Sequence, residues 1–183
     1  MKSQIYILLI FMNIAAFGQE TTNDLQKIIR ANVLSPGLEM EMPITNKSAI
    51  SANVGIGING SYKNLSYANS GLTYFLSPFL DLSYKRYYSR DAMLSNGENI
   101  PPNSGFFWGV RLLTNFKEIE TENIIRKDDI DFAFGPTWGI QRAYGSLHLL
   151  FDAGPVYYFD TIGNCGFFPI ALQLNIGFDV KRW

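Results

Sequence analysis

The segment FPIALQLNIGFDVK, residues 168–181, alternates apolar side chains with polar or small ones from end to end. The apolar set is Phe168, Ile170, Leu172, Leu174, Ile176, Phe178 and Val180. Because successive side chains of a β-strand point to opposite faces, a strand of this sequence has one wholly apolar face. The segment is therefore predicted to be a strand that separates two different environments.

Six other segments share this period-2 alternation and are bounded by residues that favour turns. They are residues 38–42, 50–59, 80–85, 106–113, 130–141 and 146–159. A closed barrel whose chain enters and leaves on the same side needs an even number of strands. Lys27–Leu34, which precedes the turn-forming Ser35-Pro36-Gly37, is predicted to be the eighth. The predicted fold class is all-β, a single antiparallel up-and-down barrel with eight strands.

Two arrangements of such strands are compatible with the alternation. A soluble barrel or sandwich turns its apolar face inward, whereas a membrane barrel turns it outward to lipid and keeps a polar interior. Charged residues make up only 17% of the chain, against roughly 25% in a soluble domain. The polar faces consist mainly of Gly, Asn, Ser, Thr, Ala and Gln, which suit a narrow lumen. We therefore expect a transmembrane barrel, with a secreted soluble barrel that binds an apolar ligand as the alternative.

The first 18 residues have the features of a secretory signal peptide. Lys2 supplies a positive charge, Ile5–Met12 is an uninterrupted apolar stretch, and small residues precede Gln19 in Ala15-Ala16-Phe17-Gly18. The apolar stretch is shorter than the roughly 20 residues that a membrane-spanning helix requires. We expect residues 1–18 to be a signal peptide and residues 19–183 to form one barrel domain.

With these features, the chain resembles the small outer-membrane barrels of the OmpA-transmembrane and OmpX class. In that class the last strand ends in an aromatic residue after alternating apolar residues, and the barrel-assembly machinery reads this signal. Leu174, Ile176, Phe178 and Val180 match the alternation, but Trp183 is out of frame. Either a bulge near Lys181-Arg182 or an aromatic role for Phe178 would restore the match. The tracts 81–88 and 135–139 also look like uncharacterised barrels of this class.

The resemblance implies the outer membrane of a Gram-negative bacterium, with its lipids and the barrel-assembly machinery as partners. Because the connections of an up-and-down barrel alternate between the two sides of the membrane, 45–47 and 142–145 are expected to be short periplasmic turns, and 60–71, 117–128 and 160–166 to be outer loops. The connection 90–104 is long although it falls on the periplasmic side, and the sequence offers no reason for its length. The function expected is structural, or interaction with a surface partner through the outer loops.

The sequence leads us to assign no catalytic, cofactor-binding or metal-binding residue. Residues 55–60 fit G-x-G-x-x-G, but a loop follows them where dinucleotide binding requires a helix. His148, the only histidine, shares the inward face with Ser146 and Asp152, so a lipid-modifying or lipid-binding barrel is the alternative function. One histidine and the single Cys165 do not make a zinc site. A net charge of −1 gives no reason to expect nucleic acid as a partner.

The inward faces also carry acids and bases that can pair with one another. The alternation along each strand places these charges in the lumen: Arg30, Glu39, Glu41, Asp81, Lys85, Arg111, Asp131, Asp152, Asp179 and Lys181. Because buried charges persist when they are paired, we expect a closed ion-pair core rather than an open pore. Candidates for aromatic residues at the membrane interface are Tyr74, Tyr84, Tyr88, Trp108, Trp138 and Tyr157. Arg86 and Arg142 fall on the apolar face near its periplasmic ends.

Overall fold

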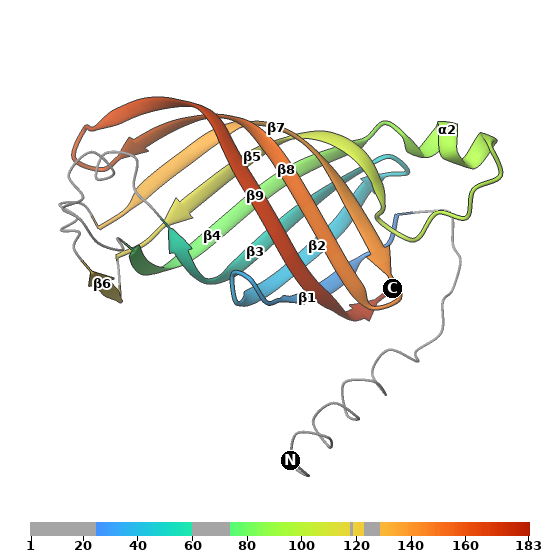
Figure 1. Cartoon of the computed structure of the whole chain (residues 1–183), viewed down its shortest axis with the longest axis horizontal. Helices are drawn as coiled ribbons and strands as arrows, with labels where there is room; N and C mark the ends of the chain where they lie inside the picture. Colours follow the sequence, from blue (N-terminus) through green and yellow to red (C-terminus); the bar gives the residue numbers. More distant parts are fainter. Residues whose placement is uncertain (1–24, 60–73, 118, 123–128) are drawn as a thin grey trace, which may run out of the picture.

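The structure, a computed structural model, describes residues 25–59, 74–117, 119–122 and 129–183. Eight antiparallel strands form one closed ring in the order β1-β2-β3-β4-β5-β7-β8-β9, with β9 paired back to β1 (Figure 1). Their bounds are β1 Ile28–Asn32, β2 Gly37–Thr45, β3 Ser48–Asn59, β4 Tyr74–Tyr87, β5 Gly105–Asn115, β7 Asp131–Tyr144, β8 Leu147–Asp160 and β9 Cys165–Arg182. The predicted all-β fold and the strand count of eight are confirmed.

Two short elements accompany the ring. The strand β6, Glu120–Glu122, pairs with the start of β4 and lies within the segment predicted as an outer loop. The helix α2, Arg90–Ser95, lies in the long connection between β4 and β5, beyond the end of the barrel where β9 ends (Figure 1). Within the part of the chain that the structure describes, no helix is long and apolar enough to cross a membrane. The predicted signal peptide and the predicted loop 60–71 lie outside the described residues.

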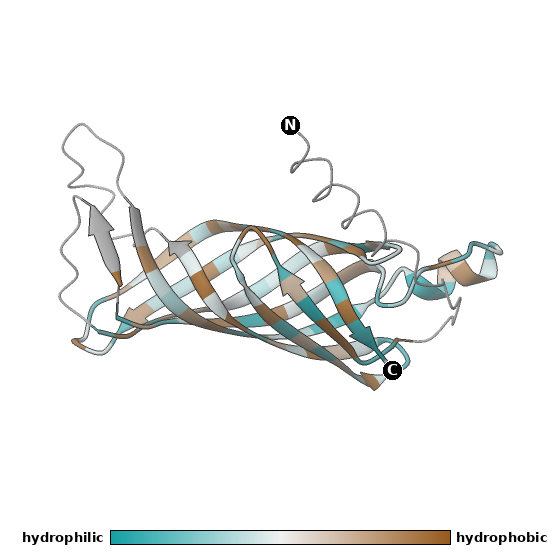
Figure 2. Ribbon diagram, turned by 90° about the horizontal axis from the view of Figure 1, so that it is seen from below, coloured by the Kyte–Doolittle hydropathy of each residue, from teal (hydrophilic) through white to brown (hydrophobic). Residues whose placement is uncertain are grey.

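The apolar faces of the strands point outward and the polar faces point inward, as predicted. The coloured ribbon alternates between hydrophobic and hydrophilic residues along the strands (Figure 2). Exposed apolar side chains surround the ring, among them Leu38, Ile50, Val54, Leu82, Trp108, Phe134, Trp138, Phe151, Leu172 and Leu174. The buried side chains include Arg30, Glu39, Glu41, Asn53, Asp81, Lys85, Gln141, His148, Asp152 and Asn175. The described strands therefore do not have the apolar interior that a soluble barrel requires.

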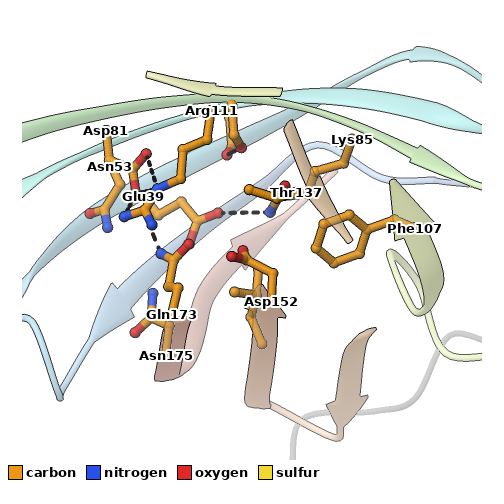
Figure 3. Close-up of a pocket in the computed structure, with 13 residues that line it drawn as sticks. Glu39, Asn53, Asp81, Lys85, Phe107, Arg111, Thr137, Asp152, Gln173 and Asn175 are labelled. Atoms are coloured by element: carbon orange, nitrogen blue, oxygen red, sulfur yellow. Dashed lines mark hydrogen bonds and ion pairs between the residues drawn. The ribbon is translucent and has the colours of Figure 1, made fainter. Parts of the chain in front are cut away.

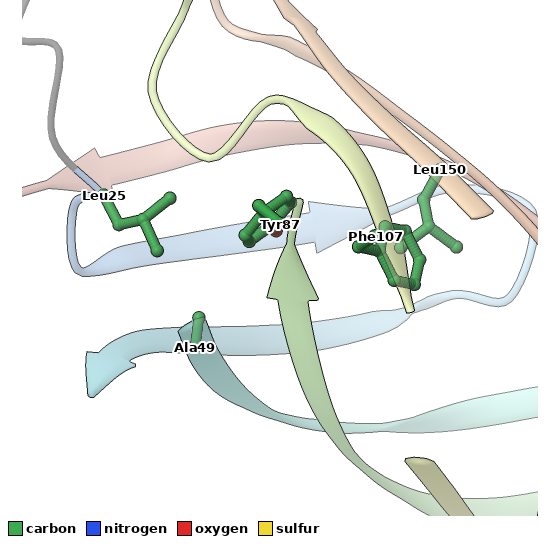
Figure 4. Packing of buried hydrophobic residues seen from close by; sticks show 5 residues of the cluster. All are labelled: Leu25, Ala49, Tyr87, Phe107 and Leu150. Carbon is green, nitrogen blue, oxygen red and sulfur yellow. The ribbon is translucent and has the colours of Figure 1, made fainter. Parts of the chain in front are cut away.

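A small apolar cluster is the exception to the polar interior. Leu25, Ala49, Tyr87, Phe107 and Leu150 are all buried and lie together toward the α2 end of the lumen (Figure 4). The rings of Tyr87 and Phe107 meet edge to face with centroids 5.9 Å apart, a geometry that aromatic pairs favour. The apolar cluster and the polar groups beside it fill the lumen toward this end.

The strand β9 departs twice from the uniform alternation predicted for it. Its pairing with β8 shifts by one residue between Gly154 and Val156, so Phe168 pairs with the inward-facing Val156 while Phe167 is exposed. The prediction that Phe168 belongs to the outer face is therefore wrong. The pairing of β9 with β1 shifts between Ile29 and Arg30. This irregularity corresponds to the bulge that the position of Trp183 suggested.

The second shift reverses the faces of the last residues. Lys181, predicted to face the lumen, is exposed, and its ammonium lies 4.5 Å from the ring centroid of Trp183. Arg182 instead turns toward Asp179 and donates to its carboxylate at 2.6 Å. One extra residue in a strand moves every later side chain to the opposite face, which explains the correction.

The connection 90–104 closes one end of the barrel, which accounts for its length. Ile100, Asn103 and Ser104 are fully buried, and the Arg90 guanidinium donates to the carbonyl of Ser104 at 2.9 Å. The hydroxyl of Ser104 accepts from the backbone N–H of Ala143 at 2.9 Å, which joins the connection to the end of β7. We refer to residues 90–104 as the end cap.

Two prolines interrupt the wall of the barrel at one level. Pro136 in β7 lies opposite Pro155 in β8, and the pairing between these strands skips from Phe134–Tyr157 to Trp138–Ala153. The neighbouring glycines allow a close approach here, because a Cβ on Gly154 would lie 1.9 Å from the carbonyl oxygen of Pro136. Proline donates no hydrogen bond to a ladder, so this part of the β7–β8 pair depends on close backbone packing.

Candidate functional site in the barrel interior

Glu41 is the centre of the polar interior. Its side chain is completely buried and accepts hydrogen bonds from five side chains. They are Arg30 at 2.6 Å, Asn103 at 2.7 Å, Tyr87 at 2.9 Å, Gln141 at 3.0 Å and Lys85 at 3.4 Å. The donors come from β1, the end cap, β4 and β7, so one carboxylate joins distant parts of the ring.

Arg30 links Glu41 to two further acids. Its Nη1 lies 3.4 Å from Oε1 of Glu39, and its Nε donates to Oδ1 of Asp179 at 2.8 Å. The strand pairing explains the contacts, because Arg30 is the direct partner of Glu39 on β2 and of Asp179 on β9. Cross-strand neighbours on one face lie within reach of long side chains. Two neighbouring strands, β2 and β9, therefore place their carboxylates around the one guanidinium on β1.

Lys85 reaches the same acids from the other side of the lumen. Its cross-strand neighbours are Ala49 on β3 and Gly109 on β5, which leave room for its long side chain. A Cβ on Gly109 would lie 2.1 Å from the carbonyl oxygen of Tyr84, so the strands approach closely there. The Lys85 ammonium donates to Gln141 at 2.9 Å and lies 3.5 Å from Glu39. Glu39 and Glu41 thus share two cations.

A second polar cluster lies further along the lumen. Arg111 on β5 and Asp81 on β4 form an ion pair at 2.8 Å, and Gln173 on β9 donates to Asp81 at 3.4 Å. Between the two clusters is a cavity of about 20 Å³ (Figure 3). Its wall includes Glu39, Asn53, Asp81, Lys85, Arg111, Thr137, Asp152, Gln173 and Asn175. Such a volume has room for about one water molecule.

The described inward charges agree with the prediction at nine positions out of ten. Arg30, Glu39, Glu41, Asp81, Lys85, Asp131 and Asp152 are buried, and Arg111 and Asp179 have inward side chains that are 19% and 2% exposed. Lys181 is the tenth and lies outside. Tyr87, Gln141 and Asn103 belong to the site although the sequence did not single them out. Gln141 is the last inward residue of the predicted strand 130–141, and Tyr87 continues the inward face of 80–85 by two residues, so the alternation could have identified both.

His148 does not form part of a catalytic arrangement in the described interior. Its side chain is fully buried, and neither ring nitrogen has a hydrogen-bond partner. Asp152 lies four residues further along the same strand, which corresponds to about 13 Å, and Ser146 lies in the β7–β8 turn. The structure brings His148 near Gly177 and Ala143, its cross-strand partners. The three residues considered for lipid chemistry are therefore not brought together.

Other sequence-based candidates lie outside the interior. Tyr88, Trp108, Trp138 and Tyr157 are exposed on the outer face, and Tyr84 packs edge to face against Trp108. Arg86 is exposed, and the Arg142 guanidinium lies 5.8 Å from the ring centroid of Phe106. The side chain of Tyr74 lies outside the described residues. The glycines of residues 55–57 belong to β3, a strand, so dinucleotide binding has no helix N-terminus there.

In the described ranges, no group of three or more His, Cys, Asp or Glu side chains could hold a metal ion. Cys165, the free thiol, is exposed at the start of β9. The interior is thus an ion-paired polar core around Glu41, with one small cavity beside it. No protein-family model, curated protein or solved structure matches this chain.

Proposed function

We propose that this chain is an outer-membrane β-barrel of a Gram-negative bacterium, with a closed lumen and a structural or surface-interaction role. One observation supports the proposal above the others: the closed ring presents apolar side chains around its outside and buries its charges inside. Soluble proteins rarely expose contiguous apolar patches larger than roughly a few hundred Å². A lipid environment makes the same surface favourable.

Closure of the strands also fits this environment. In hydrocarbon every backbone N–H and C=O must find a partner inside the protein, which a closed ring achieves by pairing its first and last strands. Here β1 pairs with β9 over Ile28–Asn32. The aromatic residues Trp108, Trp138 and Tyr157 on the outer face are of the kind that lies at the interface between lipid and water.

The lumen is proposed to be non-conducting. The Glu41 network crosses it from β2 to β7, and the end cap covers the end at which α2 lies. A barrel of eight strands has an interior that side chains fill. Planar-bilayer recordings of the purified protein should therefore show no stable conductance, and a steady channel of large conductance would contradict a closed core.

The membrane location is tested by substituting Leu174, which is 58% exposed near the middle of β9. In a bilayer, an arginine on the lipid face costs about 2–4 kcal/mol at mid-depth. In water, a change at so exposed a position alters stability by less than about 0.5 kcal/mol. Leu174→Arg should therefore lower the unfolding free energy in lipid vesicles by the larger amount, with Leu174→Gln as the uncharged control.

A simpler measurement addresses the same location. Outer-membrane fractions are run in detergent gels with and without heating, because a folded membrane barrel migrates differently before boiling. Recovery of the chain in the soluble fraction after washing with carbonate would favour a secreted barrel instead. For the surface role, shortening residues 117–128 should leave folding intact and abolish binding of any partner that the outer loops recognise.

A further inference from the structure

The cavity between the two polar clusters is lined by oxygen atoms that lack hydrogen-bonding partners. Oδ1 of Asn53 and Oδ1 of Asn175 are buried and accept no hydrogen bond within the described chain. Asp152, 5% exposed, lines the same cavity. Figure 3 shows these three side chains around one space, contributed by β3, β8 and β9. Buried polar groups in folded proteins are normally satisfied, so these oxygens indicate a missing partner.

The charges around the cavity do not balance. Its wall holds three carboxylates, on Glu39, Asp81 and Asp152, against the two cations Lys85 and Arg111. Lys85 contacts Glu39 and Arg111 contacts Asp81, so with Asp152 the wall carries one more negative charge than positive charges. A buried charge persists when another charge and hydrogen bonds compensate it. The cavity therefore needs one positive charge.

We propose that this cavity binds a single monovalent cation of about the size of sodium, held by the Asp152 carboxylate and the amide oxygens of Asn53 and Asn175. The volume of about 20 Å³ matches a water-sized occupant. Hard cations prefer oxygen ligands, which is what these side chains offer. A monovalent ion balances the single excess negative charge of the wall, and the two amide oxygens add neutral ligands.

Neighbouring groups support an ion of low charge. Thr137 adds a hydroxyl to the same wall, and Lys85 and Arg111 would repel a second positive charge. No cluster of three acidic, histidine or cysteine ligands exists among the described residues, so the stronger ligand set of a divalent site is not found. The cation completes the ion-pair core, and the inference does not depend on where the barrel resides.

The test measures thermal unfolding of the purified full-length protein in NaCl, KCl or N-methylglucamine chloride at equal ionic strength. The midpoint should rise with NaCl concentration and reach a plateau, relative to the bulky organic cation. Asp152→Asn should lose this dependence, whereas Asp129→Asn, which changes a carboxylate 75% exposed at the surface, should retain it. Identical curves in all three salts would mean that the cavity holds only water, and would overturn the proposal.

Two further outcomes decide against the cation. A midpoint that varies with pH but not with the identity of the cation would mean that a proton neutralises Asp152. Cation dependence that survives in Asp152→Asn would place the ion elsewhere. If the variant does not fold, crystals of the wild-type protein grown with thallium(I) provide the answer. An anomalous peak between Asp152, Asn53 and Asn175 is expected, and its absence refutes the site.

Discussion

Replacing Glu41 by glutamine should destabilise the barrel more than the same replacement at Glu39. The carboxylate accepts four hydrogen bonds between 2.6 and 3.0 Å, from Arg30, Asn103, Tyr87 and Gln141. In Glu41→Gln one oxygen becomes a donor that faces other donors, and Arg30 loses its shortest ion pair. Removing one partner of a buried ion pair costs about 3–5 kcal/mol. We expect a loss in that range.

Glu39→Gln is the matched control, since Glu39 lies two residues away on the same face of β2 and is 4% exposed. Its contacts with Arg30, Asn32 and Lys85 are all 3.4 to 3.5 Å long, at the limit of hydrogen bonding. Loss of such contacts should cost about 1–2 kcal/mol.

Both variants are measured by urea unfolding of the barrel folded in detergent micelles, followed by tryptophan fluorescence and by migration in unheated gels. A ratio of unfolding free-energy losses near one would refute the reasoning, because it would mean that the short contacts of Glu41 contribute nothing beyond its charge. A larger loss for Glu39→Gln would refute it as well.

Three other outcomes follow from single residues. A membrane-impermeant maleimide should label Cys165 in intact cells, because this exposed thiol lies at the barrel end opposite the end cap. If Cys165 reacts only after the cells are lysed, the predicted orientation, with the loop 160–166 outside the cell, is wrong. Asn103→Gly keeps the positive φ of 51° accessible but loses the hydrogen bonds to Gln26 and Glu41. Proteolysis within the end cap should therefore become faster, and the free energy of unfolding should fall by about 1–3 kcal/mol. Gly154→Ala should cost at least about 1–3 kcal/mol in urea unfolding, whereas Gly166→Ala, whose Cβ meets nothing within 4 Å, should be neutral. Equal effects of the two alanines would contradict the close approach at β8.

The alternation of the sequence predicted seven strands and which of their residues share a face. The eighth strand came from the even number that a closed barrel needs, and the outward direction of the apolar faces came from composition. The prediction failed at β9, where Phe167 and Phe168 are both apolar and either can face outward. The pairing shift near Pro169 selects Phe167, which is 69% exposed. A bulge depends on the partner strand, and a single strand's pattern carries no information about its partner.

The polar interior was predictable as a set of charges but not as a network. The alternation placed Arg30, Glu39 and Glu41 on the inward face. The short contact of Arg30 with Glu41, however, depends on the register between β1 and β2. The register also brings Gln141 from β7 across the lumen, 100 residues away in sequence. The end cap was not predictable, because its buried residues Ile100 and Asn103 lie in a segment without periodicity.

The end cap and the ion-pair core are joined at one atom. Oε1 of Glu41 accepts from Asn103 in the cap and from Tyr87 at the end of β4, while Oε2 accepts from the cation and amide groups deeper in the lumen. Asn103 in turn donates to and accepts from the backbone of Gln26, just before β1. Displacing the cap would therefore remove partners from a buried carboxylate and from the start of the first strand together. Because unpaired buried charges are strongly unfavourable, the cap and the core are expected to open together, so the barrel is closed by its interior chemistry as well as by its wall.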